Sequence, residues 1–167
     1  MTRLLGLDLG ERRIGVAVAD GDGSGARPLV TLRRGRDHEA DASALRTLID
    51  THAVGELIVG LPLEADGREG RQAAITRQWA DSVGPALARD VRIVMRDERL
   101  TSHLAEARLG PMPRGRSGGP PSRTQRDVYR ARVDREAAAI ILQDELDTRR
   151  GGDTSTTKPG STTEIPR

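Results

Sequence analysis

Cysteine is absent from this chain of 167 residues, and aromatic residues are almost absent, with one Trp, one Tyr and no Phe. Without cysteine there is no disulfide, no thiolate nucleophile and no cysteine-based zinc site. Without aromatic side chains there are few platforms on which a single-strand binder stacks bases. The core must therefore be aliphatic, with Trp79 expected inside it, and any binding of nucleic acid must depend on charge and shape.

Long apolar runs are missing as well. The longest, such as Ala137 to Leu142, are far shorter than the ~20 residues that a membrane-spanning helix needs. The first residues place Asp8 close to the N-terminus and lack the apolar stretch of a signal peptide. These features predict a cytoplasmic protein with no membrane partner.

Charge is nearly balanced, with 27 Lys and Arg against 25 Asp and Glu. The cations are not evenly spread, because eight arginines lie between Arg108 and Arg135 with only Asp127 and Asp134 among them. Such clustering is typical of an anion-binding surface. A general preference for arginine explains it equally well, since Lys158 is the only lysine.

The order of the expected elements indicates an α/β fold. Alternating apolar residues predict an antiparallel meander of three strands, followed by alternating helices and strands and a terminal helix. The expected strands are 3–9, 14–19, 28–32, 56–60 and 91–95, and the expected helices are 41–51, 72–88, 100–109 and 126–148. A mixed five-stranded sheet with helices on both faces is the ribonuclease H-like plan.

One domain is expected over residues 1–148, since this length suits a single core. Residues 149–167 are rich in Gly, Thr, Ser and Pro and are expected to form a disordered C-terminal tail. The segment 110–125 is rich in Pro, Gly, Ser and Arg and is expected to be a mobile loop.

Asp8 stands at the end of the first expected strand, on the face that it shares with Gly6. The glycine leaves space on this face, so a ligand has room near the carboxylate. The alternative is an aspartate at a strand end that caps the following turn through backbone N–H groups.

Two adjacent acids, Asp97 and Glu98, follow the fifth expected strand. Neighbouring residues at a strand end point to opposite faces, so at most one of them shares a site with Asp8. The other is expected to cap the next helix, a role that Thr101 also suits. Arg99 is placed to pair with a carboxylate or a phosphate. The residues alone leave the choice between Asp97 and Glu98 open.

Asp134 lies on an otherwise apolar helical stripe with Ala137, Ala138 and Ile141. A carboxylate among residues that face the core is costly unless something pairs with it. The alternative is that Asp134 caps the helix, with residues 126–133 forming a looser turn before it.

Three acids at the ends of separate elements are informative together. Carboxylates about 5 Å apart repel by roughly 3 kcal/mol per pair at an effective dielectric near 20. Cations or raised pKa values must relieve such a cluster. An all-oxygen site points to Mg²⁺ or Mn²⁺. Metal held in this way can activate water and stabilise the leaving oxygen of a phosphodiester.

The chain also contains a set of ordered motifs: Gly6–Gly10 with Arg13–Val18, Ile58–Leu63 with Asp66–Gly67, Asp97–Thr101, and Val133–Asp134 with 137–143. Together they resemble the YqgF family of pre-16S rRNA nucleases, also described as Holliday junction resolvase-like proteins. The resemblance covers residues 4 to about 147. It implies a ribonuclease H-like fold and cleavage at the 5′ end of precursor 16S rRNA, with the assembling small ribosomal subunit as a partner.

The resemblance further implies that the catalytic, metal-binding acids are Asp8, Glu98 and Asp134. The arginines expected to bind substrate are Arg12, Arg13, Arg99, Arg114, Arg116 and Arg123. The chain departs from the family pattern at Glu64-Ala65, which replaces Asn-Met, and in the longer segment before Asp134, which is richer in Pro and Gly.

Three other functions compete with this hypothesis. A DNA endonuclease that acts on four-way junctions uses the same acids. An actin-like or sugar-kinase ATPase also begins with a strand and an Asp-x-Gly turn, but it holds phosphate with hydroxyl residues where this chain has Glu11-Arg12-Arg13, and it needs two such domains. A non-catalytic ribosome-assembly or transcription factor that binds nucleic acid keeps the fold without the activity. The presence of all three acids argues against this last alternative.

Overall fold

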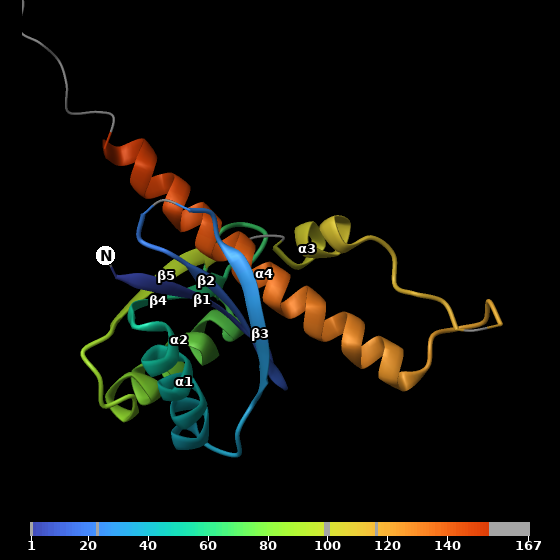
Figure 1. Cartoon of the computed structure of the whole chain (residues 1–167), viewed down its shortest axis with the longest axis horizontal. Helices are drawn as coiled ribbons and strands as arrows, with labels where there is room; N and C mark the ends of the chain where they lie inside the picture. Colours follow the sequence, from blue (N-terminus) through green and yellow to red (C-terminus); the bar gives the residue numbers. More distant parts are fainter. Residues whose placement is uncertain (1, 23, 99–100, 116, 154–167) are drawn as a thin grey trace, which may run out of the picture.

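The computed structural model describes residues 2–22, 24–98, 101–115 and 117–153. The elements in chain order are β1 (Arg3–Leu9), β2 (Arg13–Ala19), β3 (Arg27–Arg33), α1 (His38–His52), β4 (Val54–Pro62), α2 (Arg71–Ala86), β5 (Arg92–Glu98), α3 (Thr101–Leu109) and α4 (Arg123–Asp153). They form one sheet with helices packed against it (Figure 1). Among the described residues, no helix combines the length and apolar character needed to cross a membrane.

The strand order across the sheet is β3-β2-β1-β4-β5. The first three strands are antiparallel neighbours, as the short connections predicted. β4 runs parallel to both β1 and β5. This mixed five-stranded sheet confirms the predicted α/β, ribonuclease H-like plan.

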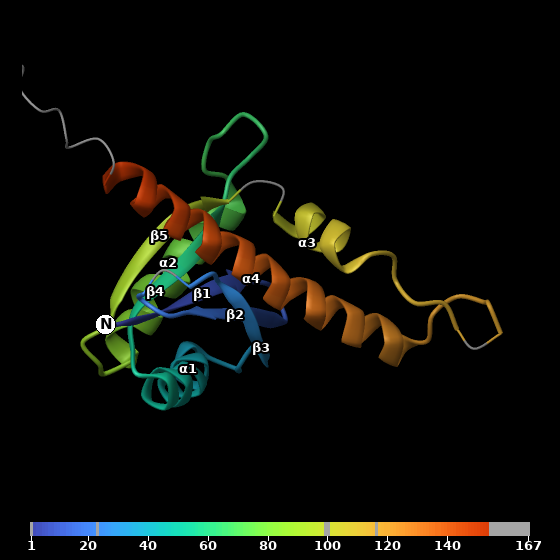
Figure 2. The same ribbon diagram turned by 45° about the horizontal axis from the view of Figure 1, so that its top comes forward.

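Helices cover both faces of the sheet, as predicted (Figure 2). On one face α1 and α2 pack on β1 side chains such as Leu5 and Leu7, and Trp79 of α2 is only 2% exposed in this core. On the other face Leu142 of α4 packs on Leu4 and the neighbouring strands. The core is aliphatic apart from Trp79, in agreement with the composition.

α4 crosses its face of the sheet obliquely and approaches the backbone of successive strands. The Thr31 hydroxyl of β3 donates to the Ala131 carbonyl at 2.5 Å. Side chains are excluded at the next two crossings: a Cβ added to Gly15 of β2 would lie 1.9 Å from the Asp134 carbonyl oxygen, and one added to Gly6 of β1 would lie 2.6 Å from the carbonyl oxygen of Ala138. The glycines therefore let α4 lie directly on the sheet, with Asp134 beside β2.

Several elements extend further than the sequence predicted, among them α1, β4, β5 and α4. β5 continues beyond Met95 to Glu98, because its pairing with β4 runs on to the pair Pro62 and Glu98. α4 continues beyond Thr148 to Asp153. The ion pairs of Arg149 with Glu56 and Glu145 fasten this end of α4. Residues 154–167 lie outside the described part of the chain, so for them the disordered tail stays a prediction.

The first half of α4, the segment after α3 and α3 itself project from one side of the sheet (Figures 1 and 2). We call α3, the segment 110–122 and residues 123–133 of α4 the arm. A small apolar cluster that includes Ala105 and Tyr129 holds it together. The Tyr129 hydroxyl also donates to the Gly110 carbonyl at 2.7 Å. α4 begins at Arg123, so the connecting segment ends before residue 125, where the expected loop ended.

Candidate active site

Asp8 lies near the end of β1 on the face covered by α4, since Leu7 and Leu9 on either side belong to the core of the opposite face. Burial, together with the negative charges of Glu98 and Asp134, raises the pKa of Asp8 to about 8. The structure therefore brings together the three acids that the sequence singled out, from β1, β5 and α4.

Glu98 is the last residue of β5, and its carboxylate lies over the backbone of β4. A Cβ added to Gly60 would come within 2.5 Å of the Glu98 Oε2 atom. Burial raises the pKa of Glu98, and a hydrogen bond with the buried Thr101 side chain acts in the opposite direction. Gly60 makes the space for this carboxylate, and Thr101, the first residue of α3, is its partner.

Asp97 points away from this site. It shares a strand face with Ile93 and Met95, which pack against the core under α1 and α2. The pKa of Arg77 in α2 is raised mainly by its hydrogen bond with Glu69, and the negative charge of Asp97 adds to this rise. The expectation that only one of the two acids faces Asp8 is confirmed. The expectation that Asp97 caps the next helix is wrong, because Asp97 lies within β5, which continues to Glu98.

Asp134 lies well inside α4, which begins at Arg123, so it does not cap the helix. Its Oδ2 atom accepts a hydrogen bond from Arg13 Nε at 2.5 Å. Both side chains of this ion pair are only about a quarter exposed, at 26% for Arg13 and 23% for Asp134. Arg13 therefore supplies the counter-charge that a carboxylate on an apolar stripe requires.

A buried ion pair braces the turn between β1 and β2, which directly follows Asp8. Asp41 of α1 is 3% exposed and accepts hydrogen bonds from Arg34 Nε and Trp79 Nε1, both at 2.9 Å. Arg34 also donates to the Gly10 carbonyl at 2.9 Å. The backbone N–H of Arg34 donates to the Arg12 carbonyl at 2.9 Å. The turn that carries Arg12 is thus fixed from two sides.

This network was not predicted from the sequence. Its one signal was Asp41, a carboxylate directly before Ala42 on the stripe that continues with Leu45 and Ile49, a position that needs a partner when it is buried. Nothing in the sequence indicated that the partner would be Arg34.

The arginines expected to bind substrate fall into three groups. Arg12 and Arg13 lie on the β1–β2 turn and line a hollow with Asp134. Arg114 and Arg123 are exposed on the arm, and Arg123 lies about 16 Å from Asp134 along α4 at ~1.5 Å per residue. The structure therefore brings Arg12 and Arg13 to the acids and leaves Arg114 and Arg123 distant from them. The other two, Arg99 and Arg116, lie outside the described residues.

The three acids offer only oxygen atoms, the donors that Mg²⁺ and Mn²⁺ prefer. The pKa of Asp8 is raised first by burial and then by the negative charges of Glu98 and Asp134, and a bound cation would relieve the effect of these charges. In the described part of the chain, no three His, Asp or Glu side chains already converge as ligands of one ion. This agrees with the contact of Asp134 with Arg13. The donor set fits a divalent cation. To bind it, Asp134 would exchange its contact with Arg13 for one with the metal.

Comparison with known proteins places this arrangement in a family. The family model described as "RuvX: Holliday junction resolvase" matches residues 2–148. A protein of Chloroflexus aurantiacus is 42% identical over 147 residues, which cover 88% of each chain. One from an Anaeromyxobacter species is 44% identical over 147 residues, covering 88% of this chain and 98% of the relative. Both are named "Putative pre-16S rRNA nuclease".

Among solved structures, a T. thermophilus RuvC in complex with a Holliday junction substrate aligns with a TM-score of 0.49 and 16% identity. The alignment covers 90% of this chain and 97% of that one.

Proposed function

Because the chain belongs to the RuvX Holliday junction resolvase family, we propose that it is a metal-dependent nuclease acting at the 5′ end of precursor 16S rRNA. The names of its relatives support this substrate. The structural observation that carries the proposal is the buried Asp8, whose pKa is raised by burial and by the charges of Glu98 and Asp134. Three carboxylates gathered from distant parts of a chain reduce stability unless they bind a cation.

In this proposal Asp8, Glu98 and Asp134 hold Mg²⁺ or Mn²⁺. When bound, the metal promotes attack of water on a phosphodiester and offsets the negative charge that develops on the leaving oxygen. The protein fixes the carboxylates for this task. Thr101 holds Glu98 by a hydrogen bond, and the close contact of α4 with Gly15 fixes the backbone of Asp134.

The arginines have a separate task. Arg13 keeps Asp134 neutralised until the cation binds. Arg12 is exposed on the braced turn beside the acids, where its guanidinium meets the phosphate backbone. The partner is precursor rRNA, within the assembling small ribosomal subunit in the cytoplasm.

The test is a cleavage assay with purified protein in Mg²⁺ or Mn²⁺. A fragment spanning the 5′ end of precursor 16S rRNA and a four-way DNA junction are offered side by side. We expect cleavage of the RNA and none by Asp8→Asn. Asp97→Asn is the matched control, because it also removes one carboxylate charge but from the face of the sheet opposite to that of Asp8.

A junction-resolving DNA endonuclease is the second candidate, favoured by the description of the matching family. Cleavage of the junction with intact RNA would assign that activity instead. Binding of either substrate without cleavage would support a non-catalytic factor and contradict the proposal.

A further inference from the structure

A hollow of about 460 Å³ lies beside Asp134, between the β1–β2 turn and the arm half of α4. Three arginines and three acids line it: Arg12, Arg13 and Arg130, with Glu11, Asp127 and Asp134. Arg13 and Asp134 form an ion pair, so their charges neutralise each other. The remaining lining charges face solvent, because all four of those side chains are exposed.

Arg12 and Arg130 differ from many arginines elsewhere on the surface. Arg3, Arg46 and Arg89 each form an ion pair with a nearby carboxylate. Within the described ranges, the guanidinium groups of Arg12 and Arg130 make neither a hydrogen bond nor an ion pair. Two free cations therefore flank the hollow from opposite sides, one on the turn and one on α4.

A third cation stands close by. Arg33 of β3 is directly opposite Arg13 in the antiparallel ladder, so both side chains leave the same face of the sheet. It is the α4 face, because the Thr31 side chain, on the same face of β3, reaches the Ala131 carbonyl. Like charges at directly opposite positions destabilise a sheet. Arg13 has Asp134, whereas Arg33 is exposed and has no partner among the described residues.

We propose that the hollow is a phosphate subsite in which Arg12 and Arg130, which line it, bind a backbone phosphate of the nucleic acid beside the scissile one, together with Arg33, which stands next to Arg13 in the β2–β3 ladder. The inference rests on the proposed nuclease function and deepens it by assigning the path of the substrate. A phosphodiester here supplies the anion that Arg33 lacks, since Arg13 is already paired with Asp134. Guanidinium groups hold phosphate through paired, charge-assisted hydrogen bonds.

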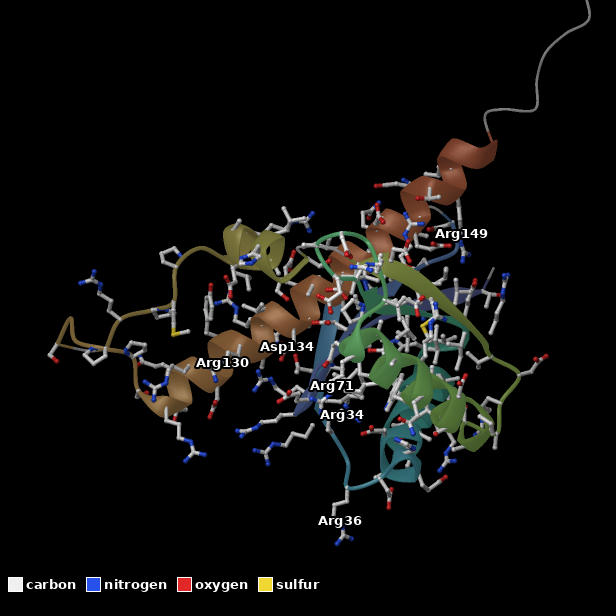
Figure 3. All side chains as sticks on the ribbon, turned by 180° about the vertical axis from the view of Figure 1, so that it is seen from behind. Arg34, Arg36, Arg71, Arg130, Asp134 and Arg149 are labelled. Carbon is white, nitrogen blue, oxygen red and sulfur yellow. The ribbon has the colours of Figure 1, made fainter. Side chains whose placement is uncertain are left out.

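Two further exposed arginines are visible in the same view of the molecule as the subsite (Figure 3). In Figure 3, Arg130 and Asp134 lie on α4, and Arg71 and Arg36 are seen below them. Arg36 and Arg71 are exposed and also lack partners in the described chain. In this proposal the backbone of the substrate runs from the acids across the β1–β2 turn and past Arg130 of α4.

The test measures binding with cleavage suppressed. The probe is a fluorescently labelled RNA hairpin with a single-stranded 5′ extension, titrated in EDTA over a series of salt concentrations. Arg33→Gln and Arg130→Gln should each weaken binding about ten-fold, as expected for loss of a charged hydrogen bond. Each should also lower the slope of log affinity against log salt, by no more than about 0.7–0.9, the value for one neutralised phosphate.

Two further variants decide between a subsite and a general charge effect. Arg27→Gln removes the same charge from the opposite end of β3, where the side chain is also exposed and free of partners in the described chain, and it should leave affinity unchanged. Asp127→Asn removes a carboxylate that opposes the phosphate in the hollow, and it should strengthen binding. Equal losses in Arg27→Gln and Arg33→Gln, or no gain in Asp127→Asn, would overturn the subsite.

The outcomes also separate this inference from the proposed function. A protein that cleaves RNA while the arginine variants bind normally keeps its activity assignment and loses the subsite. A protein that shows the expected binding pattern and never cleaves keeps the subsite and loses the nuclease assignment.

Discussion

The carboxyl group of Asp8 has its pKa raised to about 8 from the ordinary 3.8, because burial, Glu98 and Asp134 all oppose its ionisation. In the unfolded chain this carboxyl ionises near its ordinary pKa. Raising the pH from about 4 to about 8 therefore favours the unfolded state progressively, and the loss of stability is complete above the native pKa. Below pH 4 the group is protonated in both states and has no effect.

Asp8→Asn should therefore be more stable than the wild type in metal-free buffer, by a margin that grows as pH rises from 4 to 8. It should also have lost metal-dependent cleavage. Thermal unfolding in EDTA at several pH values and the RNA cleavage assay measure the two effects. Wild-type cleavage by this variant would remove Asp8 from the catalytic set.

The adjacent acids of β5 give a second prediction. Glu98→Gln should abolish cleavage as fully as Asp8→Asn, since it removes the second carboxylate of the cluster. Asp97→Asn should retain cleavage and change the free energy of unfolding by less than about 1 kcal/mol, because Asp97 is exposed on the other face. Activity that depends on Asp97 and not on Glu98 would mean that the faces of β5 are reversed.

At this scale the sequence identified the three acids but not their partners. Spacing and family motifs pointed to Asp8, Glu98 and Asp134. Arg13 and Asp134 are separated by 121 positions, so their pairing depends on how α4 lies on the sheet. Local sequence patterns report which face of an element is apolar, and they do not report which distant side chain meets it.

At the scale of elements, the sequence predicted every strand and helix, and the errors lie at their ends. β5 was expected to stop at Met95, because the apolar pattern ends there while pairing with β4 continues through Arg96 and Asp97. The polar end of the strand is the part that carries Glu98. A hydrophobic pattern therefore misses the part of the strand that carries Glu98, a metal ligand in the proposed function.

The contact of α4 with β2 gives the third prediction. In Gly15→Ala the new methyl group would meet the backbone of Asp134, so α4 must move away from the sheet. Overpacking of this kind should cost about 2 kcal/mol of stability, and displacement of Asp134 should reduce cleavage.

Gly25→Ala serves as its control, since only the end of the flexible Gln143 side chain lies near the added atom. Denaturant unfolding and RNA cleavage measure both variants. Equal, small effects in the two would show that α4 tolerates a wider separation from β2.

At the scale of the whole molecule, α4 belongs to two packing units. Its first half contributes Tyr129 and Val133 to the arm, and its second half contributes Ala138 and Leu142 to the core on the sheet. The two halves bury different faces, so one continuous apolar stripe does not describe the helix. This is why the sequence predicted the helix but not the projecting arm.

Binding of a cation should stabilise the entire fold, because only the native chain gathers the three acids. Mg²⁺ or Mn²⁺ at a hundred-fold excess over its dissociation constant should add about 2.7 kcal/mol to the free energy of unfolding. The measurement is Tm against metal concentration for the wild type and for Asp8→Asn. A similar rise in both proteins would place the stabilising ion elsewhere.

Between residues 123 and 150, α4 contains neither proline nor glycine, the residues at which helices most often kink. The part of α4 that lies in the arm is therefore a stiff extension of the helix that carries Asp134. A flexible single-stranded nucleic acid can adjust to a site of fixed shape. A rigid, folded nucleic acid fits only if its own shape matches the site. If the chain binds nucleic acid as proposed, an α4 without a kink holds Arg130 at a fixed place relative to Asp134, so a protein with few aromatic side chains would select substrates by their three-dimensional form.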